Sequence, residues 1–218
     1  MSGFSGSPRL VKGGLVLVEP VTGALLRVIA LQYNPDSLSR TLQVQGTGEG
    51  GGRSEALRLK GPPAETIKLE AEIDATDQLE HPDRNPTAIA LGIHPQLAAL
   101  ESLAYPSSIA MIANELLALI GTIEIVPMEA PLALFTWSAK RIVPVRVTDF
   151  SITEEAFDTA LNPTRAKVSL GMRVLTPDDL GYLHPAAAIF MAHLMSKEVL
   201  AGKAPAGTLS SLGLGGLP

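Results

Sequence analysis

The sequence contains no cysteine, and this absence removes several kinds of chemistry at once. A catalytic thiol, a thiolate metal site and a disulfide framework all need that side chain. The lack of cysteine is also compatible with a reducing compartment. The Ser/Gly-rich residues 1–13 are not followed by a long apolar segment, so we expect no cleaved secretory signal.

Long apolar runs and an excess of basic charge are missing as well. The densest apolar stretch, 109–125, is interrupted by Asn114, Glu115, Gly121 and Glu124, and it falls short of the about 18 residues that a membrane helix needs. The formal net charge is −5, with no basic patch that would attract a nucleic-acid backbone. We therefore predict neither a membrane span nor a nucleic-acid partner.

Motifs for catalysis, metals or cofactors are equally scarce. The four histidines include no H-x-x-x-H pair for zinc, and the sequence has neither a G-x-S-x-G elbow nor a phosphate-binding P-loop. An acidic run from Asp74 to Asp83 lacks the spacing of a calcium loop and is more typical of a hydrated turn. We predict no catalytic residue, no metal and no cofactor, with a small hydrolase kept as the weakest alternative.

A glycine-rich segment at 46–52 formally matches the dinucleotide fingerprint, with glycines at 46, 48 and 51. That site requires a helix directly after the glycines, whose N-terminal amides hold the pyrophosphate. The residues that follow are typical of a strand instead. We interpret the segment as a loop between strands.

Alternation of apolar and polar residues is the strongest pattern in the chain. In 66–75, Ile67, Leu69, Ala71 and Ile73 fall on one side and polar residues on the other, as in a half-buried strand. Further strands are predicted at 14–19, 25–33, 38–45, 132–150 and 166–175. The 17 prolines and 20 glycines fit many short elements separated by turns. The fold class that we predict is α+β and β-dominated, an antiparallel β-sandwich or barrel with flanking helices.

Helices are predicted in two regions. One stripe of leucines follows Pro95, a second helix covers 108–120, and a third runs from Pro185 to about residue 200. The helix at 108–120 is so apolar that we expect it to be buried on most sides, in the core or in a subunit interface. The chain then divides into a flexible arm (1–13), a β domain (14–176) with helices inserted near 95–120, a helical extension (177–202) and a tail (203–218). The tail is flexible by itself, and its leucines are candidates for docking on a neighbour.

Three segments resemble one known family. Residues 31–40 (LQYNPDSLSR) are similar to its Asn-Pro strand end, and 67–77 (IKLEAEIDATD) to its strand that ends in an acidic turn. The segments 135–137 (FTW), 145–157 and 162–170 (NPTRAKVSL) are similar to its aromatic strand, long hairpin and Pro-x-Arg-Ala turn. In this order they resemble the tube-like domain of contractile injection system baseplate proteins, in which a LysM module often follows. Here no such module follows, Ser138 stands where glycine is common, and the helix at 108–120 is an addition.

The resemblance implies a structural subunit of a phage-tail-like particle. It implies a hexameric ring at the baseplate, a tube initiator or adaptor that joins the spike hub to the inner tube, with those proteins and other baseplate proteins as partners. It also implies assembly in the cytoplasm before incorporation into a particle. The candidate interface or family-motif residues are Tyr33, Asn34, Pro35, Asp74, Thr76, Phe135, Trp137, Phe157, Pro163 and Arg165.

Two of these residues have alternatives. Trp137, the only tryptophan, is either a core anchor or an interface anchor. Arg165 is either a plain surface residue or the partner of a carboxylate across an interface. At the level of the whole protein, an assembly chaperone or cargo adaptor of the same particle is the alternative to a ring subunit, motivated by the leucine-bearing tail.

Overall fold

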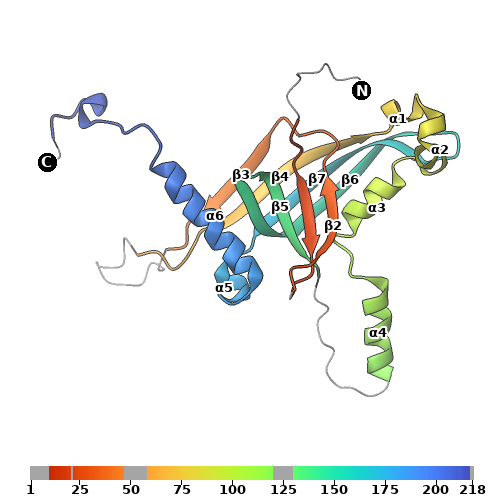
Figure 1. Cartoon of the computed structure of the whole chain (residues 1–218), viewed down its shortest axis with the longest axis horizontal. Coiled ribbons are helices and arrows are strands. Elements are labelled where there is room, and N and C mark those ends of the chain that lie inside the picture. Colours follow the sequence, from red (N-terminus) through yellow and green to blue (C-terminus); the bar gives the residue numbers. More distant parts are fainter. Residues whose placement is uncertain (1–9, 21, 47–57, 120–129, 217–218) are drawn as a thin grey trace.

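The strands of the protein form one antiparallel sheet. The computed structural model describes residues 10–20, 22–46, 58–119 and 130–216. The sheet has seven strands in the order β2-β1-β5-β6-β7-β4-β3 (Figure 1). The strands are β1 (Gly14–Val18), β2 (Leu25–Ala30), β3 (Leu38–Gln43), β4 (Ala64–Asp74), β5 (Leu132–Ser138), β6 (Arg141–Phe157) and β7 (Pro163–Val174). The prediction of a β-dominated α+β fold is confirmed.

The clearest alternation in the sequence produces the centre of this sheet. In β4 the predicted apolar set is buried, and in β7 the buried set includes Val168, Leu170 and Met172. The two strands pair so that Leu69 lies opposite Leu170 and Ile67 opposite Met172. Because side chains alternate between the faces of a strand, this register places the apolar residues of both strands on the same face.

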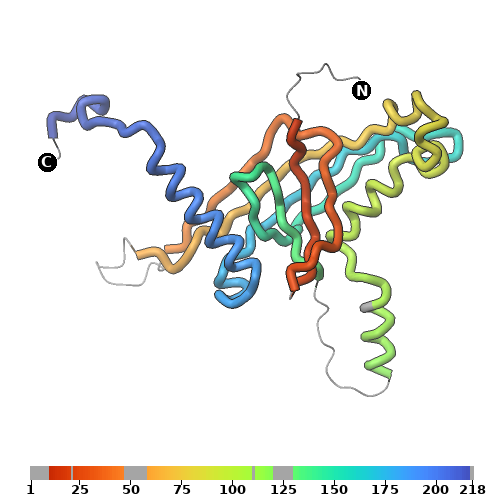
Figure 2. The backbone as a smooth tube through the Cα atoms, viewed as in Figure 1, coloured from red at the N-terminus to blue at the C-terminus, as the bar shows by residue number. Residues whose placement is uncertain are grey.

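The sheet curls around one main core, beside which Val18, Leu132 and Ala186 form a small second cluster. Leu15 and Leu17 of β1, near one end of the strand order, belong to the same buried cluster as Ile67 of β4, near the other end. Register shifts in the long strand β6, between Val147 and Asp149 and again after Glu154, bend that strand further. Figure 2 shows β1 and β2 crossing the direction of β4 and β7 at a steep angle. The predicted sandwich or barrel therefore takes the form of one continuous sheet that wraps its own core.

Helices cover one end of the core. Ile93, Leu97 and Leu100 of the α3 region are buried in the cluster formed by the sheet. The helices are α1 (Thr76–Leu79), η1 (Pro82–Arg84), α2 (Pro86–Leu91), α3 (His94–Glu101), α4 (Ser108–Leu119), α5 (Pro177–Leu180), α6 (Pro185–Ala201) and η2 (Leu209–Leu212). In the described part of the chain, no helix is both long and apolar enough to span a bilayer.

Helix α4 does not lie in the core, so the prediction that placed it there as one of two options is wrong. Ile109 is 79% exposed and Leu119 is 75% exposed. Figure 1 shows α4 standing clear of the sheet. The neighbouring helix α3, in contrast, buries Leu97 and Leu100 in the core.

Two other predicted segments differ in detail. The apolar run 132–150 is two strands, because the chain turns after Ser138, whose Oγ accepts a hydrogen bond from the Lys140 amide at 3.1 Å. The C-terminal helix α6 buries Phe190 against the sheet and then leads away from it, and the residues after Gly202 are exposed (Figure 1). The glycine-rich segment lies outside the described residues apart from Gly46, which forms an isolated bridge with Leu59.

Candidate functional site

The most unusual surface of the molecule is the pair of sheet edges. Within the described residues, β2 and β3 each have a neighbouring strand on one side only. Apolar side chains are exposed on both: Leu25 (64%), Leu26 (54%) and Val28 (59%) on β2, and Leu42 (48%) on β3. Neither strand contains proline, and each carries a single charge, Arg27 or Arg40. Proteins usually protect free edges with charge, proline or bulges, so edges of this kind favour pairing with another strand.

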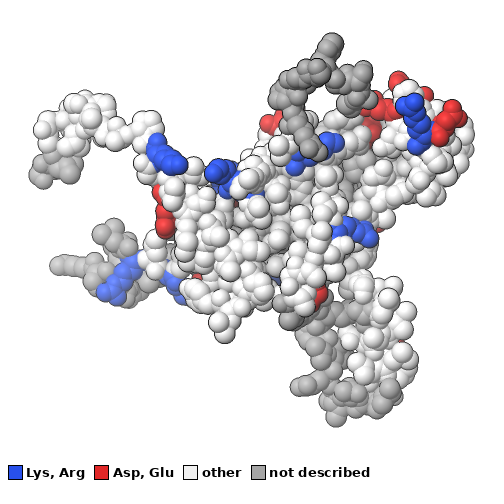
Figure 3. Space-filling model, viewed as in Figure 1, with Lys and Arg blue, Asp and Glu red and all other residues white. Residues whose placement is uncertain are grey.

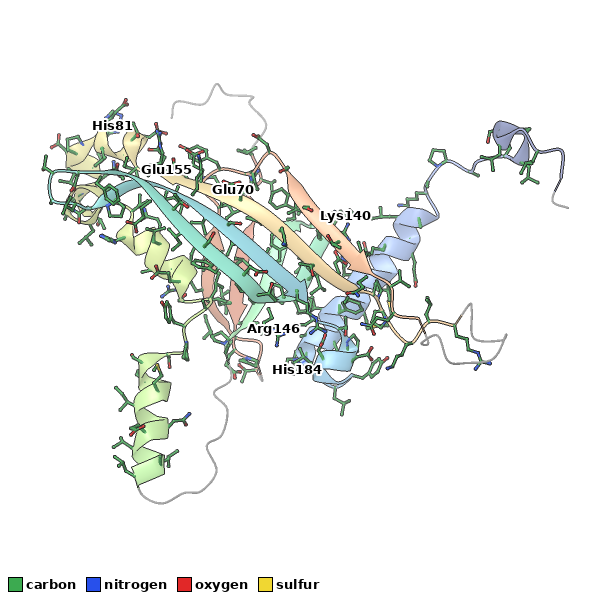
Figure 4. All side chains as sticks on the ribbon, turned by 180° about the vertical axis from the view of Figure 1, so that it is seen from behind. Glu70, His81, Lys140, Arg146, Glu155 and His184 are labelled. Atoms are coloured by element: carbon green, nitrogen blue, oxygen red, sulfur yellow. The ribbon has the colours of Figure 1, made fainter. Side chains whose placement is uncertain are left out.

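One face of the sheet is broad and polar. It is formed by β3, β4, β7 and β6, and Figure 4 views it from behind, where Glu70 and Glu155 lie on it. Its exposed residues include Ser39, Thr41, Lys68, Glu70, Glu72, Ser151, Thr153, Glu155, Lys167 and Ser169. Lys167 Nζ lies 2.9 Å from Glu155 Oε1, so part of this charge is neutralised within the face. The polar set predicted for β4 thus belongs to a continuous hydrated surface.

Three family-motif segments that are distant in sequence meet at the end of β4. The Asp74 carboxylate accepts hydrogen bonds from Thr76, through its amide at 2.7 Å and its hydroxyl. Arg165 Nη2 lies 2.6 Å from Asp74 Oδ2. Burial raises the pKa of Asp74, but the hydrogen bonds from Thr76 and Arg165 and the charge of Arg165 outweigh it and hold this pKa below its ordinary value. Arg165 therefore has its carboxylate partner within its own chain.

The first motif segment reaches the same place through Gln32. Its side-chain amide donates to the Asp74 carbonyl at 2.6 Å and accepts from the Asp74 amide at 3.0 Å. Next to it, Tyr33, Asn34 and Pro35 line an open hollow of about 330 Å³ together with Glu70, Glu72 and Lys167. Residues of all three motif segments therefore border one depression at the rim of the polar face.

Asn34 also holds the residues that directly precede β1. Its side-chain oxygen accepts from the Gly13 amide at 2.9 Å, and its amide nitrogen donates to the Val11 carbonyl at 2.9 Å. Asn34 thus ties the residues before β1 to the end of the β1–β2 unit. These two hydrogen bonds give Asn34 a structural role, so no ligand is needed to explain the Asn-Pro pair at the end of the strand.

The Pro163 motif anchors the helical end of the molecule. The carbonyl of Pro163 accepts a hydrogen bond from the Ile93 amide at 2.8 Å. Gly92 has φ +55°, and a Cβ added there would collide with the Pro163 carbonyl oxygen. Phe157, at the end of β6, is paired with Pro163 and is 52% exposed. Pro163 is therefore a structural anchor, whereas about half of Phe157 is exposed to solvent.

The aromatic motif is mainly part of the core. Phe135 is fully buried, and its ring stacks on Trp137 at a centroid distance of 5.9 Å. Trp137 is half-buried against the core cluster and also covers Gly13, where a Cβ would lie 2.6 Å from its ring. Of the two roles considered for Trp137, the geometry fits the core anchor.

An ionic cluster that sequence reasoning missed ties α6 to the sheet. Glu65 is 6% exposed on the core side of β4. Its Oε1 lies 2.7 Å from Arg40 Nη2, and its Oε2 lies 3.3 Å from Lys197 Nζ. Burial raises the pKa of Glu65, but the hydrogen bond from Arg40 and the charges of Lys197 and Arg40 together bring this pKa below its ordinary value of 4.5. Glu65 lies just before the predicted strand 66–75, two residues from Ile67, so a longer strand with an acid in its apolar set is the sequence signal that could have revealed it.

His193 lies beside this cluster on α6. Burial lowers its pKa, and the positive charges of Lys197, Arg40 and Arg141 lower it further, against a smaller opposite effect of Glu65. The other histidines have local or exposed positions: His184 caps α6 by accepting from the Ala186 amide at 3.1 Å. No three metal-ligating side chains gather within the part of the chain that the structure describes.

Comparison with known proteins gives a distant structural similarity. No family model and no curated protein matches the sequence. Among solved structures, the chain is similar to a chain from the tail of an empty GTA particle that was computed with helical refinement and C6 symmetry. The two are 11% identical, the match covers 75% of this chain and 90% of that chain, and the TM-score is 0.30.

Proposed function

We propose that this protein is a structural ring subunit of a contractile injection particle, and that neighbouring subunits join through the edges of their sheets. The observation that carries the proposal is the pair of open edges, β2 and β3, each with exposed apolar side chains and without proline. In the ring, β2 of one copy pairs with β3 of the next, so that every edge finds a partner.

Pairing of two different edges has a geometric consequence. Such a contact is heterologous, because each subunit offers a different surface to each neighbour, and it closes into a ring when the rotation allows. The seven-stranded sheets of the subunits then continue into one another. A sheet closed in this way has no edge left on which unrelated strands can add.

The polar face gives such a ring a lumen. Along β4, Lys68, Glu70 and Glu72 are exposed on the side away from the core, and β7 adds Lys167 and Ser169. A surface that is hydrated across four strands cannot be part of a dry interface without large desolvation costs. It suits the wall of a water-filled channel, while the apolar core and helices α1–α3 lie on the other side of the sheet.

The position that we propose within the particle follows from the three-segment resemblance. A hexameric ring of this kind would act as tube initiator or adaptor at the baseplate, between the spike hub and the inner tube. Its partners would be those proteins, other baseplate proteins and five further copies of itself. Assembly in the cytoplasm would precede its incorporation, and the protein would have no catalytic role.

Charged substitutions at the two edges test this proposal. We expect Val28→Lys and Leu42→Lys, which add charge to exposed positions, to abolish ring formation in native mass spectrometry. Thr153→Lys is the matched control, because Thr153 is exposed on β6 in the middle of the sheet. The control should retain the wild-type assembly. Rings that persist in both edge variants would rule out edge pairing as the joint.

A further inference from the structure

Helix α4 carries a regular apolar seam that no part of the core uses. Ile109, Ile112, Leu116 and Leu119 are spaced by three, four and three residues, which places them on one stripe of the helix. Their exposed fractions are 79%, 61%, 54% and 75%. The spacing is that of the a and d positions of a heptad repeat, in which the apolar residues of one helix fit between those of another.

Further apolar residues flank this seam on both sides. At 3.6 residues per turn, Leu117 and Met111 lie about 120° from the middle of the stripe, one on each side, and they are 50% and 53% exposed. Asn114 lies opposite the stripe. Because apolar side chains occur on three sides of the helix, one partner helix cannot cover them all, and α4 suits a place between two neighbours.

We propose that α4 packs against the α4 helices of neighbouring copies of this chain, forming a second layer of contacts beside the sheet. A stripe of isoleucine and leucine is complementary to a copy of itself, because knobs and holes on both helices have the same size and spacing. The inference deepens the proposed function, since a closed ring gives every copy two neighbours. The number of neighbours depends on the proposed ring, whereas the pairing of two α4 helices does not.

The charge and placement of α4 support another copy as the partner. Glu115 is its only charged residue, and it borders the seam without lying in it, so two parallel copies of the helix hold their carboxylates on opposite sides of the contact. Figure 3 shows the face of α4 that is visible there without Lys, Arg, Asp or Glu, whereas charges gather at the α1–α2 corner. Because α4 stands clear of the sheet (Figure 1), its seam is accessible to a second molecule without unfolding of the core.

An isolated helix of this length also needs such a partner. A helix of 12 residues is marginal in water even with favourable sequence, since most helical stability in proteins comes from packing of an apolar face. Association of neighbouring α4 helices buries side chains that are otherwise at least half exposed. Ordering of α4 and assembly of the ring are therefore coupled.

Disulfide trapping in the full-length protein tests the inference. The chain has no cysteine, so Leu116→Cys introduces a single thiol on the seam, and Asn114→Cys introduces one on the opposite side as the matched control. Under mild oxidation we expect Leu116→Cys to form dimers at least about tenfold faster than Asn114→Cys. Thermal unfolding of both variants checks that the core is unchanged, as expected for positions outside it.

Native mass spectrometry of the same samples separates this inference from the proposed ring. Equal or absent trapping in the two variants, with the ring intact, overturns the α4 contact and leaves the edge pairing standing. Selective trapping at Leu116 in a protein whose edge variants still assemble overturns the edge pairing and supports α4. Trapping of Leu116→Cys to a different particle protein, and not to itself, also overturns the inference.

Discussion

At the scale of single side chains, two carboxylates near the ends of β4 shape this molecule, Glu65 on the core side and Asp74 on the polar side. Glu65 lies among apolar neighbours on β4 and is satisfied by Arg40 from β3 and Lys197 from α6. Asp74 is satisfied by Thr76 and Arg165 at the other end of the same strand. These contacts fix β3, β7 and α6 relative to β4.

Replacement of the buried carboxylate tests the first of these clusters. We expect Glu65→Gln to lower the free energy of unfolding by about 2 kcal/mol at neutral pH, because it leaves two cations facing a neutral amide. Glu70→Gln, an exposed position on the opposite face of β4, should cost less than about 0.5 kcal/mol. Chemical denaturation measures both values.

The same substitution has a defined pH dependence. Because the pKa of Glu65 is lower in the folded protein than its ordinary value of 4.5, its contribution to stability is present above that value and is lost as the pH falls through the folded pKa. The difference in the free energy of unfolding between wild type and Glu65→Gln should therefore become smaller at acidic pH. A difference that stays constant or widens there would contradict the assigned role.

Sequence reasoning at this scale succeeded where partners are local and failed where they are distant. Arg40 falls in the apolar set of the predicted strand 38–45, with Leu38 and Leu42, but Lys197 is 132 residues from Glu65, and no pattern links them. In the same way, Arg165 was expected at the surface or across an interface, and its partner Asp74 is 91 residues away in the same chain. Long-range pairs of single charges leave no periodic signal.

At the scale of elements, the chain before α3 packs closely against the β6–β7 turn. We expect Gly92→Ala to lower the free energy of unfolding by about 3 kcal/mol, because its φ is +55° and the new Cβ would meet the Pro163 carbonyl oxygen. Gly23→Ala is the control: its φ is +69°, but nothing lies within 4 Å of the added Cβ. It should cost only about 1 kcal/mol. If both variants lose the same free energy of unfolding in thermal or chemical denaturation, the collision with Pro163 makes no contribution.

The elements also differ in how well the sequence predicts them. The strict alternation of β4 and β7 gives a buried and an exposed face, and both faces lie as predicted. The run 132–150 has no glycine or asparagine at its turn, where residues 138–141 read SAKR, so the short connection between β5 and β6 was not recognised in it. Helix α4 was recognised as a helix, but its apolar composition alone could not distinguish a place in the core from one in an interface.

At the scale of the whole molecule, the proposed assembly depends on which apolar side chains remain exposed outside the core. The curled sheet and α3 enclose the main core, and exposed apolar side chains remain on the two edges, on α4, and on α6 and the C-terminal tail. The sequence predicts strands but not their order, because pairing of distant strands depends on contacts that have no local pattern. Which strands become edges was therefore not predictable.

The most direct test of the central claim is a cryo-EM map of the assembled particle with this chain tagged. The account predicts a single ring of six copies near the baseplate, with β2 of each copy beside β3 of the next and the polar face of β4 and β7 lining the channel. A purified particle that contains no copy of this chain, or a ring in which β2 and β3 both face solvent, would contradict it.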